Sequence, residues 1–206
     1  MRIVDISIPL ETGMFKFPRP DHVTVSITAE GTYEEVACRT SRLVLGSHSG
    51  THVDAPMHMI EGADPIDQVP LDYVFGPAQV LRIPAGPKEV IDVDRLQDTE
   101  LTEKRVILNT GWHKQWGSDR FYREYPVATD EFARALVDGG VRCIVVDLPV
   151  SVSFHKIVLG AGGCLVENVA NLDDISSDKV LLVALPIKAI GIDAAPARVV
   201  VVEGFE

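Results

Sequence analysis

Alternation of apolar and polar residues predicts strands over three segments near the amino terminus, 3–8, 23–27 and 36–45. Six further short apolar runs also predict strands. They lie at 78–83, 106–108, 143–146, 164–166, 180–185 and 199–202. By this pattern strands outnumber helices along the chain.

One helix has clear signals at both ends. Thr129 or Asp130 provides its N-cap, its first turn is acidic, and Gly139-Gly140 terminates it. Shorter helices are predicted at 93–96, at 153–159 and within 66–74, where Pro70 interrupts. Because the capped helix leads directly into the apolar strand at 143–146, we expect an α/β fold built on a mixed sheet.

The composition is that of an ordinary globular protein of 206 residues, with 46% hydrophobic and 24% charged residues. Such a chain buries a large core without disulfides or a structural metal. No repeat or linker divides it, so we expect a single domain over residues 1–206. Its three cysteines have no CxxC spacing and the amino terminus lacks a signal-peptide core, which predicts reduced thiols and a cytoplasmic location.

The formal net charge is −11 and the few cations are scattered, so no basic patch could offset repulsion by nucleic acid or an anionic membrane. The longest apolar runs are also too short to span a bilayer. We therefore expect neither nucleic acid nor membrane as a partner, and a small-molecule substrate instead.

Candidate chemistry is concentrated in one short segment, where His48, His52, Asp54 and His58 fall within eleven residues. A nearby glycine and proline make a continuous helix improbable, and in an extended stretch residues two apart share a face. His52 and Asp54 would then point to one centre, with His48 folded back onto it. Single loop histidines are more often solvated or bonded to backbone, but this group suits zinc, manganese or iron(II).

These residues resemble a family signature. The segment from His48 to His58, HSGTHVDAPMH, is similar to the HxGTHxDxPxH signature of the metal-dependent cyclase family, which includes bacterial kynurenine formamidases and isatin hydrolases. The resemblance extends over nearly the whole chain, through the segments DISIPL, ADPIDQVPLD, LNTGWHKQW, HKIVLGAGGCLVENVANL and LPIKAIGIDAAPARVV.

By position, the resemblance implies a two-metal centre. The implied ligands are His48, His52, Asp54, His155 and Glu167, with the two carboxylates bridging the metals. His58 matches the catalytic acid or base. Without the resemblance, His155 would be taken for a surface or cap residue at a helix start, and Glu167 for a solvated strand end.

The resemblance also implies a swivelling β/β/α fold, a homodimer or homotetramer, and an active site near the subunit interface. The cofactor would be one or two divalent metal ions per subunit. Zinc is the first expectation, with manganese, iron or cobalt as alternatives, because the donor set accepts all four.

The implied activity is hydrolysis of a non-peptide carbon–nitrogen bond, in an aryl formamide such as an N-formylkynurenine-like compound or in a small cyclic amide. A cyclase or dehydratase of a small metabolite is one alternative. A metal-binding or ligand-binding protein without turnover is another, although the presence of His58 argues against it.

Two aromatic residues are candidates for substrate contact. Phe17 precedes Pro18 where the kynurenine formamidases have Trp-Pro-Gly-Asp, but here Arg19-Pro20 replaces the glycine. Phe17 could instead cover a hydrophobic patch. Trp112 could line the pocket or anchor the core, and Asp147 at a strand end could be functional or could orient a turn.

Overall fold

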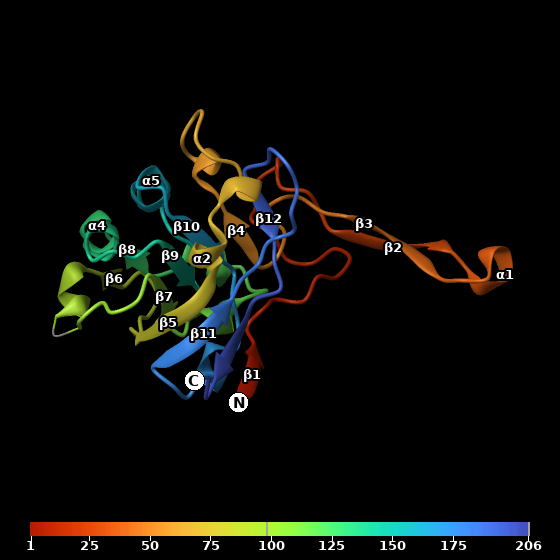
Figure 1. Cartoon of the computed structure of the whole chain (residues 1–206). Coiled ribbons are helices and arrows are strands. Elements are labelled where there is room, and N and C mark those ends of the chain that lie inside the picture. Colours follow the sequence, from red (N-terminus) through yellow and green to blue (C-terminus); the bar gives the residue numbers. More distant parts are fainter. Residues whose placement is uncertain (98, 206) are drawn as a thin grey trace.

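The computed structural model describes residues 1–97 and 99–205 (Figure 1). Its main feature is a curled mixed sheet of nine strands. In sheet order these are β1 (Arg2–Asp5), β13 (Val200–Glu203), β11 (Lys179–Val183), β5 (Phe75–Arg82), β7 (Arg105–Asn109), β9 (Cys143–Val146), β10 (Cys164–Glu167), β4 (His52–Asp54) and β12 (Ala194–Pro196). Strands β5, β7, β9 and β10 run parallel and the other pairings are antiparallel. The predicted α/β class with a mixed sheet is confirmed.

Both faces of the parallel strands are buried. Ile144 and Val146 of β9 face a core shared with α4 (Asp130–Asp138) and α5 (Val152–Gly160), which cover the outer face (Figure 1). Val145, between them, faces a second core inside the curl of the sheet. Burial on two faces explains why these strands are continuous apolar runs in the sequence.

Side-chain caps begin both long helices. The Thr129 side chain accepts a hydrogen bond from the Phe132 amide at the start of α4, which confirms the predicted cap. Ser151, for which no cap was predicted, accepts one from the Phe154 amide and starts α5 at Val152. The shorter elements are η1 (Pro56–His58), η2 (Ile66–Gln68), α2 (Leu71–Val74), β6 (Val90–Ile91), η3 (Val93–Leu96), η4 (Trp112–Gln115), α3 (Arg120–Arg123), β8 (Val127–Ala128) and η5 (Leu172–Asp174). None of the helices within the described ranges is long and apolar enough to cross a membrane.

A hairpin arm projects from the body (Figure 1). It consists of β2 (Ser26–Gly31), α1 (Tyr33–Val36) and β3 (Thr40–Val44). The predicted strand at 36–45 is wrong in its first residues, because Thr32 caps a helical turn that ends where Ala37 takes a left-handed φ of 59°. The strand predicted at 23–27 is displaced to Ser26–Gly31, because pairing with β3 fixes its register.

Two strands of the nine-stranded sheet had no sequence prediction. β4 and β12 have three residues each, too few for a hydrophobic pattern. They form because β4 pairs with β10 on one side and with β12 on the other. This end of the sheet carries the candidate site.

Candidate metal centre

The strand pair β4–β10 brings three of the predicted ligands onto one face of the sheet. His52 and Asp54 alternate with Val53, which points into the core within the curl. In the antiparallel register His52 is the partner of Glu167, so their side chains share a face. Helix α5 packs over that face and contributes His155, which is 7% exposed.

Nitrogen and carboxylate oxygen atoms converge between these elements. His52 Nε2 lies 3.3 Å from Asp54 Oδ1 and 3.5 Å from Glu167 Oε2. His155 Nε2 lies 3.6 Å from Asp54 Oδ2 and 3.3 Å from Glu167 Oε1. His48, which precedes the strand, has Nδ1 at 3.0 Å from Asp54 Oδ1. The structure thus brings all five predicted ligands together.

Backbone carbonyls orient two of the imidazoles. His52 Nδ1 lies 2.9 Å from the Gly50 carbonyl oxygen, and His155 Nδ1 lies 2.9 Å from that of Ser151. A carbonyl only accepts, so each Nδ1 carries a proton, and Nε2 is the nitrogen of each ring that faces the carboxylates. Gly50 makes this turn with a φ of +62°, and a Cβ there would lie 2.8 Å from a Leu10 methyl carbon.

Buried atoms at the centre have no hydrogen-bond partner. Within the described part of the chain these include both carboxylate oxygens of Asp54, which is 0% exposed, and His52 Nε2. A buried carboxylate without hydrogen bonds is costly unless a cation compensates it. Imidazole nitrogens and carboxylate oxygens are donors for zinc, manganese, iron or cobalt. The residues present therefore fit a divalent metal.

The electrostatics of the cluster also favour a cation. Burial opposes the charged form of His52, yet Asp54 and Glu167 outweigh it and raise the pKa of His52 to about 10. The same balance raises the pKa of His155 to about 11. Burial raises the pKa of Glu167, but His155 and His52 outweigh this and lower it to about 2. Asp54 and Glu167 therefore stay ionised and stabilise positive charge beside them, either on the imidazoles or on a divalent ion that displaces the imidazole protons.

Asp193 belongs to the same cluster, although no role for it followed from the sequence. It immediately precedes β12, where Ala194 pairs with Asp54. Its Oδ2 lies 2.8 Å from His48 Nε2 and 3.2 Å from His58 Nδ1. These two hydrogen bonds hold the pKa of Asp193 well below its usual value. The available signal was its position in the GIDAAP segment, which the family resemblance included.

His58 stands at the end of η1, beside the predicted ligands. Its ring centroid lies 4.3 Å from that of His48 and 5.7 Å from that of His155. One nitrogen of His58 also lies within 4.8 Å of ligand atoms of Asp54 and His155. The geometry therefore places His58 where it could exchange protons with a molecule bound at the centre.

Two adjoining cavities, of about 300 and 170 Å³, open over the histidines. Both are lined by Phe17, His22 and Tyr122, so they form one bipartite cavity. Phe17 meets Tyr122 edge to face at 5.0 Å. Trp116 lines the larger part, which gives the cavity an aromatic wall.

Trp112 does not line this cavity. It is 3% exposed in the core beneath α4 and α5, and its indole nitrogen donates to the Phe121 carbonyl at 3.1 Å. The prediction of a substrate-binding Trp112 is therefore wrong, and the core alternative holds. The turn after β7 buries this indole and turns Trp116 toward the cavity instead.

Asp147 has a structural position. It is 0% exposed, and its carboxylate accepts hydrogen bonds from the Thr110 hydroxyl at 2.6 Å and from His113 Nδ1 at 3.0 Å. It thus fixes the turn between β7 and η4.

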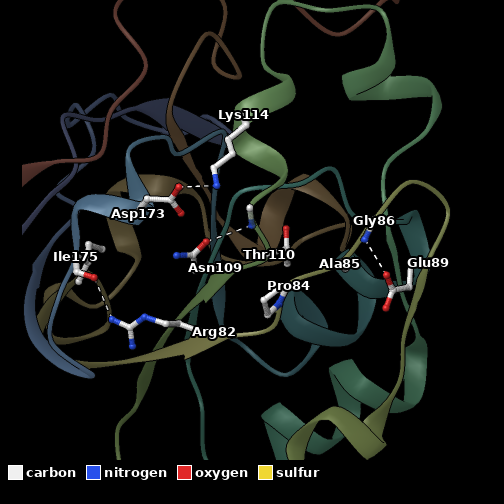
Figure 2. A pocket seen from close by; sticks show the side chains of 11 residues that line it. Arg82, Pro84, Ala85, Gly86, Glu89, Asn109, Thr110, Lys114, Asp173 and Ile175 are labelled. Carbon is white, nitrogen blue, oxygen red and sulfur yellow. Dashed lines mark hydrogen bonds and ion pairs between the residues drawn. The ribbon is translucent and has the colours of Figure 1, made fainter.

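A separate cavity of about 630 Å³ opens where β5 and β7 end (Figure 2). Among the described residues, it shares no lining residue with the cavity over the histidines. Its charged groups are paired, with Lys114 at 2.5 Å from Asp173 and Arg82 donating to the Ile175 carbonyl at 3.0 Å (Figure 2). We therefore take the histidine cluster as the candidate site.

Comparison with known proteins agrees with this geometry. The chain is 29% identical over 207 residues to a kynurenine formamidase of Salinibacter ruber, with 97% of each chain covered. It superimposes with a TM-score of 0.81 on a solved structure described as a potential metal-dependent hydrolase with cyclase activity, at 27% identity, covering 97% of this chain and 96% of the other. Isatin hydrolase A from Labrenzia aggregata shares the fold, with a TM-score of 0.85 at 22% identity over 97% and 93% of the two chains.

The family model described as "Putative cyclase" matches residues 4–151, which include His48, His52, Asp54 and His58. This match covers well over half of the chain, and the residues after 151 carry the rest of the cluster on α5, on β10 and before β12. The chain belongs to the cyclase family.

Proposed function

We propose that the protein hydrolyses a non-peptide carbon–nitrogen bond, in an aryl formamide or a small cyclic amide. The observation that carries this proposal is the set of buried metal-ligating atoms on Asp54 and His52 that have no hydrogen-bond partner, next to a cavity that also exposes His58. Kynurenine formamidases among the relatives act on a substrate of this kind by name.

One or two divalent ions would be held by the five converging side chains, with zinc as the first candidate and manganese, iron or cobalt as alternatives. These side chains are His48, His52, Asp54, His155 and Glu167. A cation bound there would lower the pKa of a coordinated water and polarise the substrate carbonyl oxygen.

His58 moves the proton that this reaction requires. Its Nδ1–H donates to Asp193, which leaves Nε2 free to accept a proton from water. An amide nitrogen leaves far more readily once protonated, and His58 would deliver the proton to it. An imidazole nitrogen can both accept and release a proton, so His58 suits both steps.

The cavity supports an aromatic substrate. Phe17, Trp116 and Tyr122 offer flat apolar surfaces to a planar ring, while the carbonyl faces the donor cluster. In this proposal Phe17 contacts the substrate, and Trp116 takes the role that the sequence had suggested for Trp112.

The test is a hydrolysis screen combined with metal analysis. Purified protein loaded with zinc, manganese or cobalt is assayed against formanilides, lactams and imides, and His58→Ala is assayed in parallel. We expect turnover by the wild type, and a kcat lower by about 100- to 10,000-fold in His58→Ala with metal content unchanged. Absence of activity with every metal would reject the hydrolase, and loss of metal from His58→Ala would make His58 a ligand.

We also propose that the protein is a homodimer or homotetramer through the hairpin arm. Leu43, Val44 and Ile27 on the arm are 55%, 45% and 38% exposed, and a two-stranded ribbon without a core is only marginally stable in water. A second copy would cover these side chains. Light scattering after size exclusion tests this, because Leu43→Glu with Val44→Glu should lower the molar mass to that of one chain.

We further propose that the protein works in the cytoplasm. Cys143 and Cys164 are paired in register on β9 and β10 and are both free and buried, and Cys38 is free and exposed. Thiols that stay reduced are typical of a reducing compartment. Cell fractionation of the native host checks this, and recovery in an oxidising compartment would reject it.

A further inference from the structure

A single carboxylate oxygen joins a predicted metal ligand to the predicted acid–base group. Asp193 Oδ2 meets His48 Nε2 at 2.8 Å and His58 Nδ1 at 3.2 Å. The two rings lie close, with centroids 4.3 Å apart and planes tilted by 50°. Both nitrogens act as donors, because an ionised carboxylate only accepts.

This sharing fixes which nitrogen of each ring remains free. With its proton on Nε2, His48 presents the Nδ1 lone pair to the centre, where it lies 3.0 Å from Asp54 Oδ1. With its proton on Nδ1, His58 presents Nε2 to the cavity. A hydrogen bond to one ring nitrogen sets the tautomer, and a carboxylate partner makes the other nitrogen more basic.

The backbone holds Asp193 firmly in place. Its carbonyl oxygen accepts the Ala55 amide at 2.9 Å, and the next residue begins β12 against β4. Before it, the Gly191 amide donates to Asp67 Oδ1 at 2.8 Å. Asp193 is therefore fixed to the same strand that carries Asp54, although the two residues are distant in sequence.

We infer that Asp193 is a positioning residue that orients His48 for metal binding and His58 for proton transfer at the same time. The inference has two parts. The His58 part, orientation for proton transfer, rests on the proposed hydrolase function. The His48 part, orientation for metal binding, concerns cation affinity alone and is independent of turnover.

The first test measures cation affinity of the metal-free protein by competition with a chromophoric zinc chelator. We expect Asp193→Ala to weaken zinc binding by about 10- to 100-fold, the usual loss when a carboxylate that orients a ligand is removed. Asp193→Asn keeps an acceptor oxygen and should lose less. Zinc affinity of Asp193→Ala within about 2-fold of the wild type would overturn the His48 part.

The control is Asp67→Ala, which removes the acceptor of the Gly191 amide and loosens the same loop without touching either histidine. It should bind zinc as tightly as the wild type. If Asp67→Ala and Asp193→Ala weaken zinc binding equally, loop rigidity explains the effect and the inference fails.

The second test measures kcat and KM at saturating zinc, in wild-type and His58→Ala backgrounds. Asp193→Ala should lower kcat at least 10-fold in the wild type, with little change in KM. In the His58→Ala background the same change should have almost no further effect, because residues that act as a unit are not additive. Equal losses in both backgrounds would overturn the His58 part. If the wild type itself has no turnover, the proposed function fails, while the zinc measurement still decides the His48 part.

Discussion

Thr51 joins three segments of the chain beside the metal centre, and its removal should be costly. Its hydroxyl accepts the Ile8 amide at 2.8 Å and donates to the Asn168 carbonyl. Thr51, Ile8 and Asn168 are 3%, 6% and 9% exposed. One hydroxyl thus satisfies two buried backbone groups, between the start of β4 and the end of β10.

Thr51→Val replaces the hydroxyl by a methyl group of nearly equal volume. Packing changes little, but an amide and a carbonyl lose their partner. Each unsatisfied buried group costs about 1–3 kcal/mol, so with two such groups we expect the free energy of unfolding to fall by about 2–6 kcal/mol. Urea denaturation followed by circular dichroism gives this value by linear extrapolation.

The chain offers a matched control in Thr12. Its hydroxyl likewise accepts the Ile27 amide at 2.9 Å and donates to the Ile27 carbonyl at 3.2 Å, but in an exposed setting. Water replaces the hydroxyl there, so Thr12→Val should change stability by no more than about 0.5 kcal/mol. If the losses in unfolding free energy of Thr51→Val and Thr12→Val differ by less than about 0.5 kcal/mol, burial does not determine how much these hydrogen bonds stabilise the protein, and the reasoning is refuted.

Three further predictions concern the metal, pH and substrate. Zinc at 100 times its Kd should stabilise the folded protein by about 2.7 kcal/mol, so removal of zinc by a chelator should lower Tm. Asp54→Ala lacks one of the proposed ligands and should show no zinc-dependent rise in Tm. The Ser177 amide and the hydroxyl and amide of Ser176 donate hydrogen bonds to Glu203 and lower the pKa of its carboxyl from the usual 4.5 to about 2. The ionised carboxylate therefore stabilises the fold fully above about pH 4.5, and this contribution is lost as the pH falls toward 2. The stability difference between wild type and Glu203→Gln should therefore narrow below about pH 4.5 in urea titrations, and a constant difference would contradict this. Phe17→Ala should raise KM by about 2- to 12-fold with kcat little changed, since an aromatic contact is worth about 0.5–1.5 kcal/mol. Phe75→Ala, at a site that lines neither part of the cavity, should leave KM unchanged.

Local signals predicted the elements whose ends are marked in the chain. Thr129 caps α4 as expected, and the apolar runs of β9 and β10 lie within one residue of their predicted bounds. The hairpin arm was less predictable. Its residues alternate as strands do, yet Thr32 forms a local cap that breaks the segment into a helical turn and a strand.

The two tryptophans show a different limit. Trp112 and Trp116 lie four residues apart in one short segment, and nothing in the local pattern separates them. The hydrogen bond from Trp112 to Phe121 and the turn held by Asp147 decide which indole is buried. Both contacts join residues distant enough that no periodicity signals them.

By itself the sequence determined the type of chemistry, because His48, His52, Asp54 and His58 are concentrated in a stretch whose glycine and proline prevent one continuous helix. It also determined the α/β class, since runs buried on two faces and capped helices are local properties. Only the tertiary structure decided which distant groups complete the centre. Glu167 faces His52 through strand register, and Asp193 reaches His48 because the three-residue strand β12 pairs with β4. Such pairings are stabilised by the partner strand and not by the segment itself, so the segment alone contains no signal for them.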